Sequence, residues 1–142
     1  MGSYKYLIIP ILSLIICQIL KFLIEGIINH KFDIYRLIDG SGGMPSTHST
    51  FVVSLTTTVG LNYGFDHVLF AICTIFSLVI LYDAMGVRYE TGKQAEIINN
   101  IIVKMSYDYQ ALKEKVGHKP VEVLVGTILG IVLGITLNMF IN

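Results

Sequence analysis

Long apolar runs constrain the fold of this chain more than any other feature of its sequence. Residues 6–28, 67–83 and 120–141 are strongly apolar, and each run is close to the ~20 residues that a helix needs to cross a bilayer. The whole chain is 54% hydrophobic and only 14% charged, whereas soluble domains carry about 25% charged residues. The sequence therefore predicts an integral membrane protein.

A fourth run, residues 45–61, is more polar and rich in serine and threonine. A membrane helix of this composition is expected inside a bundle, where its hydroxyl groups find partners, rather than facing lipid. A chain of 142 residues has room for one ordinary domain. The predicted fold class is therefore all-α, with one domain over residues 1–142 that forms a polytopic membrane helix bundle of about four spans.

Residues 94–115 are predicted to form an additional amphipathic helix, at the membrane interface or packed on the bundle. Their apolar side chains recur at three- and four-residue spacing, which places them on one helical face. Charged residues such as Lys104 and Asp108 would be costly in hydrocarbon, so a fifth span is disfavoured. The apolar positions are Ile97, Ile98, Ile101, Ile102 and Met105.

Charge and cysteine content exclude several classes of protein. Ten Lys and Arg residues balance ten Asp and Glu residues and no basic face emerges, so no nucleic-acid partner is expected. Cys17 and Cys73 both lie within apolar runs, and we expect small buried hydrophobic residues there rather than a disulfide. High hydrophobicity without net charge also excludes a disordered chain.

Basic residues are distributed unevenly along the chain. Nine of the ten lie at the end of the first run, in the connection 29–44 or in residues 88–119, whereas the turn 62–66 has none. Connections rich in Lys and Arg stay in the cytoplasm. The sequence thus predicts a protein of the cell (plasma) membrane with its two basic connections in the cytoplasm and both termini outside.

Three glycines, Gly126, Gly130 and Gly134, lie on one face of the last run and form two overlapping G-x-x-x-G units. Small residues at this spacing allow two membrane helices to approach closely. The partner helix belongs either to the same chain or to a second copy, and the sequence leaves both interpretations open.

A glycine-rich segment precedes the second predicted helix and ends in Pro45, Ser46, Thr47 and His48. Pro, Ser and Thr are typical of a helix start, where unpaired N–H groups and the helix dipole favour an anion. Gly43 and the glycine before it would let a bulky anion come close to the backbone. His48 is therefore a candidate for acid–base chemistry on a bound anion.

A second histidine stands at the start of the last predicted helix, in the segment 117–122. His118 and Glu122 are four residues apart and so share one helical face. A carboxylate in this position can hold one imidazole nitrogen and leave the other free to act as a nucleophile. Each histidine alone could be an ordinary interfacial side chain, but both stand at helix starts on the same predicted membrane face.

Basic residues are available at the same depth, and we expect them to bind an anionic substrate. Two histidines, several cations and exposed helix starts suit phosphoryl transfer, in which the protein positions the group and stabilises its charge. A nucleophilic histidine needs no metal, and no ligand-rich motif supports a metal site, so no cofactor is expected. The candidate cations are Lys21, Arg36, Arg88 and Lys93.

The segments GGMPSTHS and GHKPVEVLVGTILG resemble two motifs of the type-2 phosphatidic acid phosphatase superfamily, which also contains vanadium-dependent haloperoxidases. Together with DAMGVRYETGKQAEIIN, they resemble a divergent branch of small membrane proteins known as acid phosphatase/vanadium-dependent haloperoxidase-related. The resemblance covers about residues 6–140. It implies a helical membrane-embedded phosphatase fold and a hydrolase acting on lipid phosphates.

The resemblance also implies roles for individual residues. His118 matches the nucleophile that forms a phosphohistidine intermediate, and Glu122 matches the acid that orients it, here Glu in place of the usual Asp. His48 matches the general acid that protonates the leaving alkoxide, and Ser46 matches the serine that contacts phosphate. Lys21 matches the lysine of the first motif.

Two arginines of the family pattern are absent from their usual positions. The Arg-Pro expected seven residues after the first-motif lysine is replaced by residues 28–29, and the Ser-Arg before the nucleophile by residues 111–112. Arg88, Lys93 and Arg36 are candidates to replace them in space.

Two functions therefore remain open. The first is a metal-independent phosphatase for a phosphomonoester or diphosphate lipid at the cytoplasmic face. The second is a catalytically impaired relative that binds or moves such a lipid. Expected partners are the phosphorylated lipid, membrane lipids and, because typical relatives have six spans, a second copy that completes a homodimer.

Overall fold

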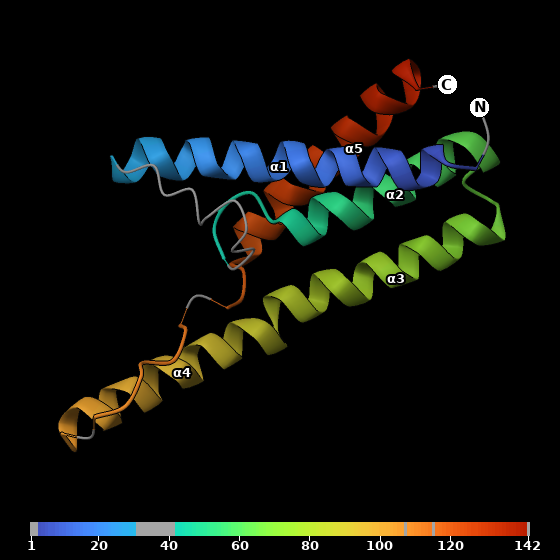
Figure 1. Cartoon of the computed structure of the whole chain (residues 1–142). Helices are drawn as coiled ribbons and strands as arrows, with labels where there is room; N and C mark the ends of the chain where they lie inside the picture. Colours follow the sequence, from blue (N-terminus) through green and yellow to red (C-terminus); the bar gives the residue numbers. More distant parts are fainter. Residues whose placement is uncertain (1–2, 31–41, 107, 115, 142) are drawn as a thin grey trace.

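The computed structural model describes residues 3–30, 42–106, 108–114 and 116–141, and within these ranges all regular structure is helical. The helices form an extended bundle rather than a globule (Figure 1). This architecture confirms the prediction of an all-α membrane bundle. The five helices are α1 (Lys5–Asn29), α2 (Thr47–Tyr63), α3 (Val68–Met85), α4 (Val87–Lys104) and α5 (Pro120–Phe140).

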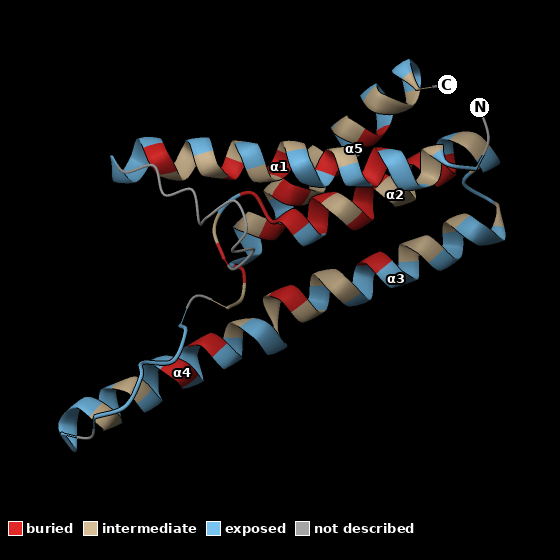
Figure 2. Cartoon of the chain, viewed as in Figure 1, coloured by how far each residue is buried: buried red, intermediate tan, exposed pale blue. Residues whose placement is uncertain are grey.

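Helix α2 forms the centre of the bundle and packs against α5, α1 and α3. Most of its residues are at least partly covered, whereas α3 and α4 are largely exposed (Figure 2). In the described part of the chain, three helical segments are long and apolar enough to cross a membrane: α1, the continuous stretch Val68–Lys104, and α5. The polar α2 is shorter and lies among them, as its composition predicts.

The hydroxyl groups of α2 are satisfied inside the bundle. Thr50 Oγ1 donates to the Ser46 carbonyl at 3.0 Å and to the Gly126 carbonyl of α5 at 3.0 Å. Thr58 Oγ1 donates to the Ser54 carbonyl at 2.8 Å. Because the hydroxyls of α2 find acceptors, most of them backbone carbonyls, burying this polar helix carries little desolvation cost.

The glycine face of α5 packs against α2 of the same chain. A Cβ added at Gly126 would lie 2.5 Å from the Ser46 carbonyl oxygen, and one at Gly130 would lie 2.8 Å from the Thr50 carbonyl oxygen. The glycines therefore bring two backbones together within the chain. Of the two partners that the sequence left open for the glycine face, a helix of the same chain or one of a second copy, the structure shows the first.

We predict that Gly130→Leu destabilises the protein by about 1–3 kcal/mol or more, because the added atoms must displace the backbone of α2. Thermal unfolding in detergent measures the effect. Ile128→Leu is the matched control, since Ile128 lies in the same helix, is 54% exposed and keeps its volume on substitution. Equal stability of the two variants would contradict the packing described here.

Helix α3 continues into α4 with a break only at Gly86, and α4 extends beyond the ends of α2 and α5 (Figure 1). The predicted helix 94–115 is thus wrong in its bounds, since α4 starts at Val87 and ends at Lys104. Ser106, with φ 54°, reverses the chain, which then runs back along α4. Asn99 holds this returning segment by accepting from the Leu112 N–H and donating to its carbonyl, at 2.8 and 2.9 Å.

Candidate active site

The two histidines singled out by the sequence face each other at one end of the bundle. His48 lies in the first turn of α2, and His118 lies two residues before α5. Their ring centroids are 6.2 Å apart, and the rings meet edge to face at 63°. A phosphoryl group between the two rings would be in reach of both, so a nucleophile and an acid can share this site.

His118 is almost completely buried, with 2% of its surface exposed. Its Nδ1 is 3.1 Å from Glu122 Oε2, and its backbone N–H donates to the Ala84 carbonyl at 3.1 Å. The same Glu122 oxygen accepts from the Lys119 N–H at 3.1 Å, which fixes the carboxylate at the start of α5. An Nδ1–H that donates to Glu122 leaves Nε2 with its lone pair, the state that a nucleophile requires.

Burial lowers the pKa of His118 below its usual value because the imidazolium ion loses its hydration. The hydrogen bond and the charge of Glu122 act in the opposite direction, as does a hydrogen bond to the backbone of Gly43, while the charge of Lys21 lowers the pKa further. The net effect is downward, so the ring is predominantly neutral at pH 7.

Lys21 reaches this site from α1 and is also buried, with 1% exposed. Its Nζ donates to the Gly42 carbonyl at 2.9 Å. Both Gly42 (φ 60°) and Gly43 (φ 85°) adopt left-handed backbone conformations, which favour glycine. A Cβ at Gly43 would collide with Glu25 Oε1, so α1 holds this loop closely through the side chains of Lys21 and Glu25, one turn apart.

Ser46, which the sequence predicts to contact phosphate, is not freely accessible in the structure. It is completely buried and is the N-cap of α2, where Oγ accepts from the Ser49 N–H at 3.4 Å and from the Ser49 hydroxyl at 2.9 Å. Its own N–H donates to the Glu122 carbonyl at 3.1 Å. Ser46 therefore joins the starts of α2 and α5, which positions both histidines.

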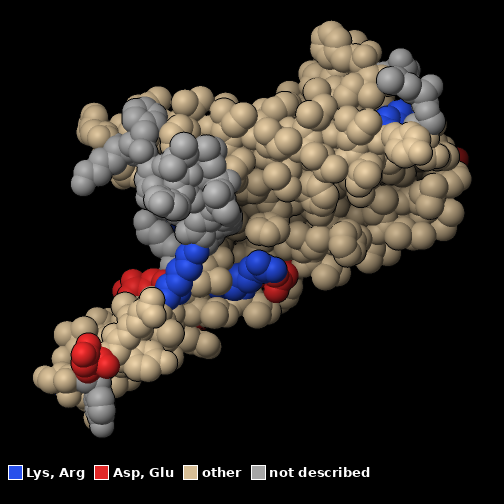
Figure 3. All heavy atoms as spheres, viewed as in Figure 1, with Lys and Arg blue, Asp and Glu red and all other residues tan. Residues whose placement is uncertain are grey.

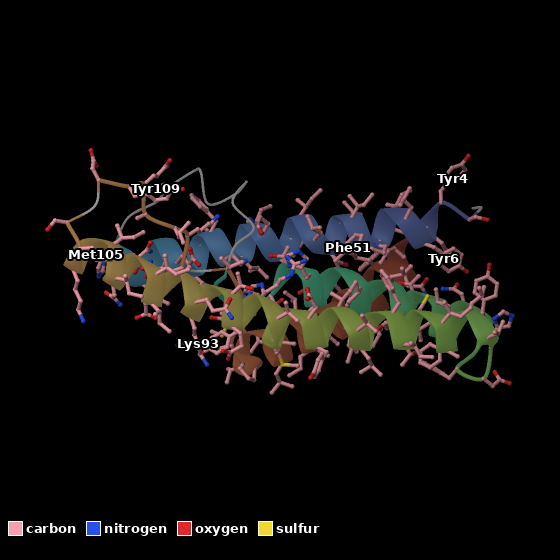
Figure 4. The ribbon with its side chains drawn as sticks, turned by 90° about the horizontal axis from the view of Figure 1, so that it is seen from below. Tyr4, Tyr6, Phe51, Lys93, Met105 and Tyr109 are labelled. Carbon is pink, nitrogen blue, oxygen red and sulfur yellow. The ribbon has the colours of Figure 1, made fainter. Side chains whose placement is uncertain are left out.

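Arg88 and Lys93 lie on the outer side of the site. Arg88 Nε pairs with Asp83 Oδ2 at 2.6 Å, and both charges are within electrostatic range of His48. Lys93 pairs with Glu90 and projects away from the helices (Figure 4). The structure thus brings Arg88 near the histidines but not Lys93, while Arg36 lies outside the described residues.

Most of the charged side chains on the face shown in Figure 3 gather where α3 passes into α4 and along α4 itself, and a few lie at the opposite end. A cavity of about 290 Å³ with several charged lining residues opens beside His118 and includes Glu25 and Tyr89, which were not among the residues predicted from the sequence. The signal for Glu25 was its ionisable side chain within an apolar run. The cavity is lined by Glu25, Gly42, Gly43, Tyr89, Glu114, Gly117, Lys119 and Glu122.

Comparison with known proteins identifies the family of this chain. The model of a family described as the Divergent PAP2 family matches residues 3–133. The chain is also 37% identical to a protein of Bacillus subtilis (strain 168) named "Uncharacterized membrane protein YuiD", with 82% of this chain and 85% of the relative covered. No solved structure is significantly similar to this chain. The expected resemblance is confirmed, and the chain belongs to the Divergent PAP2 family of membrane proteins.

Proposed function

We propose that this protein is a metal-independent lipid-phosphate phosphatase that acts through a phosphohistidine intermediate. The observation that carries the proposal is the pairing of His48 and His118 at 6.2 Å, with Glu122 bound to Nδ1 of His118. The phosphatase-related family supports the same chemistry. A phosphomonoester or diphosphate lipid is the proposed substrate.

The reaction has two steps that share the same residues. Nε2 of His118 attacks phosphorus, the bond to the leaving oxygen breaks, and His48 donates a proton to that oxygen. His48, now neutral, then accepts a proton from a water molecule that attacks the phosphohistidine. Inorganic phosphate leaves, and both histidines return to their initial states.

Arg88 is the proposed replacement for an arginine that the family pattern leads one to expect, and it would act together with Lys21, the match to the lysine of the first motif. Lys21 is buried next to the Gly42–Gly43 loop, and Arg88 is half-exposed on the side of His48. An anion between the rings would lie within electrostatic range of both cations, and electrostatic stabilisation of this kind is the main demand of phosphoryl transfer. Asp83 would hold Arg88 until the substrate binds.

The proposed location is the cytoplasmic face of the cell membrane. The site lies at the end of the bundle where α3 passes into the charged helix α4 (Figures 1 and 3). Basic connections favour the cytoplasmic side. A phosphate group held there would lie at headgroup depth, with its hydrocarbon portion among the helices.

The second candidate function is binding or transport of a phosphorylated lipid without turnover. It is favoured by one observation: the Lys21 ammonium donates to the Gly42 carbonyl and the Ser46 hydroxyl caps α2, so both side chains have structural partners. Phosphate release by purified protein in liposomes distinguishes the candidates. Turnover of a lipid monoester or diphosphate supports the phosphatase, whereas saturable binding with no release over both classes supports the alternative.

Two substitutions are expected to shift the acid limb of the kcat/KM profile in opposite directions. Only neutral His118 can attack, so activity falls as pH drops through its pKa. Lys21→Met removes a charge that lowers this pKa, and the limb should move to higher pH. Glu122→Gln removes a charge that raises it, and the limb should move to lower pH.

The test is to measure kcat/KM as a function of pH for the unaltered protein and, from their residual activity, for both variants. The unaltered protein should keep activity below pH 6.5, because burial lowers the His118 pKa. A shift of both variants in the same direction would show that another group controls the acid limb.

A further inference from the structure

An apolar groove runs between α3 and α5, away from the polar part of the site. It consists of two cavities of about 670 and 390 Å³, which share Leu78 and Leu81 as lining residues. Helix α3 packs mainly on α2 and only slightly on α5, which leaves the groove open along its length. The two cavities therefore adjoin at Leu78 and Leu81 along α3, and α2 contributes to the wall of the second cavity.

The groove is apolar even though several of its lining residues carry hydroxyl groups. Thr56 and Thr57 donate to the carbonyls of Val52 and Val53 at 2.9 and 2.8 Å, respectively. Thr74 and Thr127 likewise bond to carbonyls one turn earlier in their own helices. These hydroxyls are already satisfied, so the groove offers a ligand mainly methyl and methylene surface. Such a wall suits a hydrocarbon chain and disfavours a polar ligand.

One end of the groove lies at the start of α5, next to the candidate active site in the sequence. Met85, Pro120 and Val123 line this end, and they are close in sequence to the residues that carry the chemistry. Pro120 and Val123 flank Glu122, and Pro120 lies two residues after His118. A molecule that lies in the groove with its head at this end would place that head near the buried histidine and the cations around it.

The other end of the groove is lined by an aromatic pair. Phe65 and Phe70 meet edge to face at 86°, with ring centroids 5.1 Å apart. They lie directly on Gly60, where an added Cβ would be 2.6 Å from Phe65 and 3.0 Å from Phe70. From Phe70 to Met85 the groove follows about 15 residues of helix, or ~22 Å at 1.5 Å per residue. This exceeds half of the ~30 Å hydrocarbon core.

We propose that the α3–α5 groove binds one extended hydrocarbon chain of the lipid phosphate, and that Phe65 and Phe70 set the longest chain accepted. The proposal rests on the proposed function, because the active site supplies the binding site for the anionic head. Cations at one end and apolar walls along the rest match an amphiphile of this kind. A helix from a second copy, 10–12 Å wide, would need roughly 1,700 Å³ over ~22 Å, more than the two cavities together contain.

The first test is a series of linear alkyl phosphates of increasing chain length, assayed with variants of the groove. Activity of the unaltered protein should rise with chain length and then stop rising once the chain reaches the aromatic pair. Phe70→Ala should move this limit to longer chains. Leu78→Trp, in the shared middle of the groove, should shorten it and lower kcat/KM for the best substrate by about tenfold, because the bulkier side chain narrows the groove.

Phe76→Trp is the matched control, because Phe76 belongs to α3, is 56% exposed and does not line either cavity. All variants should hydrolyse para-nitrophenyl phosphate, which has no chain, at the rate of the unaltered protein. This separates a blocked groove from a damaged fold. Identical chain-length limits in Leu78→Trp, Phe70→Ala and the control would overturn the proposal while leaving the phosphatase assignment intact.

The second test does not depend on turnover. An alkyl phosphate with a diazirine at the end of its chain, photolysed with the protein in liposomes, should label residues near Phe70, Ile131 and Ile135. Labelling spread over the lipid-facing side of α1 instead would refute a specific groove. Crosslinking of Leu78→Cys between two chains would show that a second copy covers the groove, and would also overturn the proposal. Because the labelling needs no catalysis, its result stands even if no substrate is hydrolysed.

Discussion

His118→Ala should abolish phosphate release, with a fall in kcat on the order of 10⁴- to 10⁶-fold, as expected for the loss of a nucleophile. The imidazole of His118 is 2% exposed and is fixed at Nδ1 by Glu122, so its position is set before substrate binds. Water cannot replace it effectively, because the covalent step depends on a preplaced ring nitrogen. Initial rates of phosphate release in liposomes measure the loss.

His30→Ala provides the control for this substitution. His30 is an exposed histidine after the last residue of α1 and has no place in the proposed reaction. It should keep the rate of the unaltered protein. Retention of appreciable activity by His118→Ala would remove the assigned mechanism, and binding without turnover by all proteins would favour the lipid-binding alternative.

The second large effect is expected from His48→Gln, and its size should depend on the leaving group. An alkoxide is a poor leaving group, so loss of the proton donor should lower kcat/KM for an alkyl phosphate by about 10²- to 10⁴-fold. Para-nitrophenolate leaves without a proton, so kcat/KM for its phosphate should change little. The ratio of these two effects identifies His48 as the general acid, because a general loss of structure would lower both.

For this test, kcat/KM is measured for the alkyl phosphate and for para-nitrophenyl phosphate. The same preparations of His48→Gln, His30→Gln and unaltered protein are used for both substrates. The His30 variant should show no leaving-group dependence beyond that of the unaltered protein. Equal losses for the two substrates in His48→Gln would assign His48 a structural role instead, for example in packing against His118.

Much of the fold followed from the sequence because local signals and bilayer physics agree. The apolar runs became α1, α3 and α5, and the Ser- and Thr-rich run became the central helix α2. The helix starts were also predictable: Ser46 caps α2, and Pro120 begins α5. Because each histidine stands at one of these starts, topology alone was enough to predict that the rings lie at the same end of the bundle.

Features that depend on tertiary contacts were harder to predict. The helix 94–115 was wrong because its periodicity continues only to Met105, and the reversal at Ser106 is held by Asn99, a contact between distant residues. The partner of the glycine face required the packing of α5 on α2. Similarly, spacing alone gave no reason why Lys93 projects outward while Arg88 lies near His48.

The central claim is that His118 carries the phosphoryl group during turnover, and trapping that intermediate tests it most directly. Protein mixed with a lipid phosphate and quenched in alkali within one turnover should yield a peptide with phosphate on His118, identified by mass spectrometry. The modified fraction should vanish in His118→Ala. Turnover with phosphate on another residue, or with no phosphorylated protein under conditions that preserve phosphohistidine, would contradict the account.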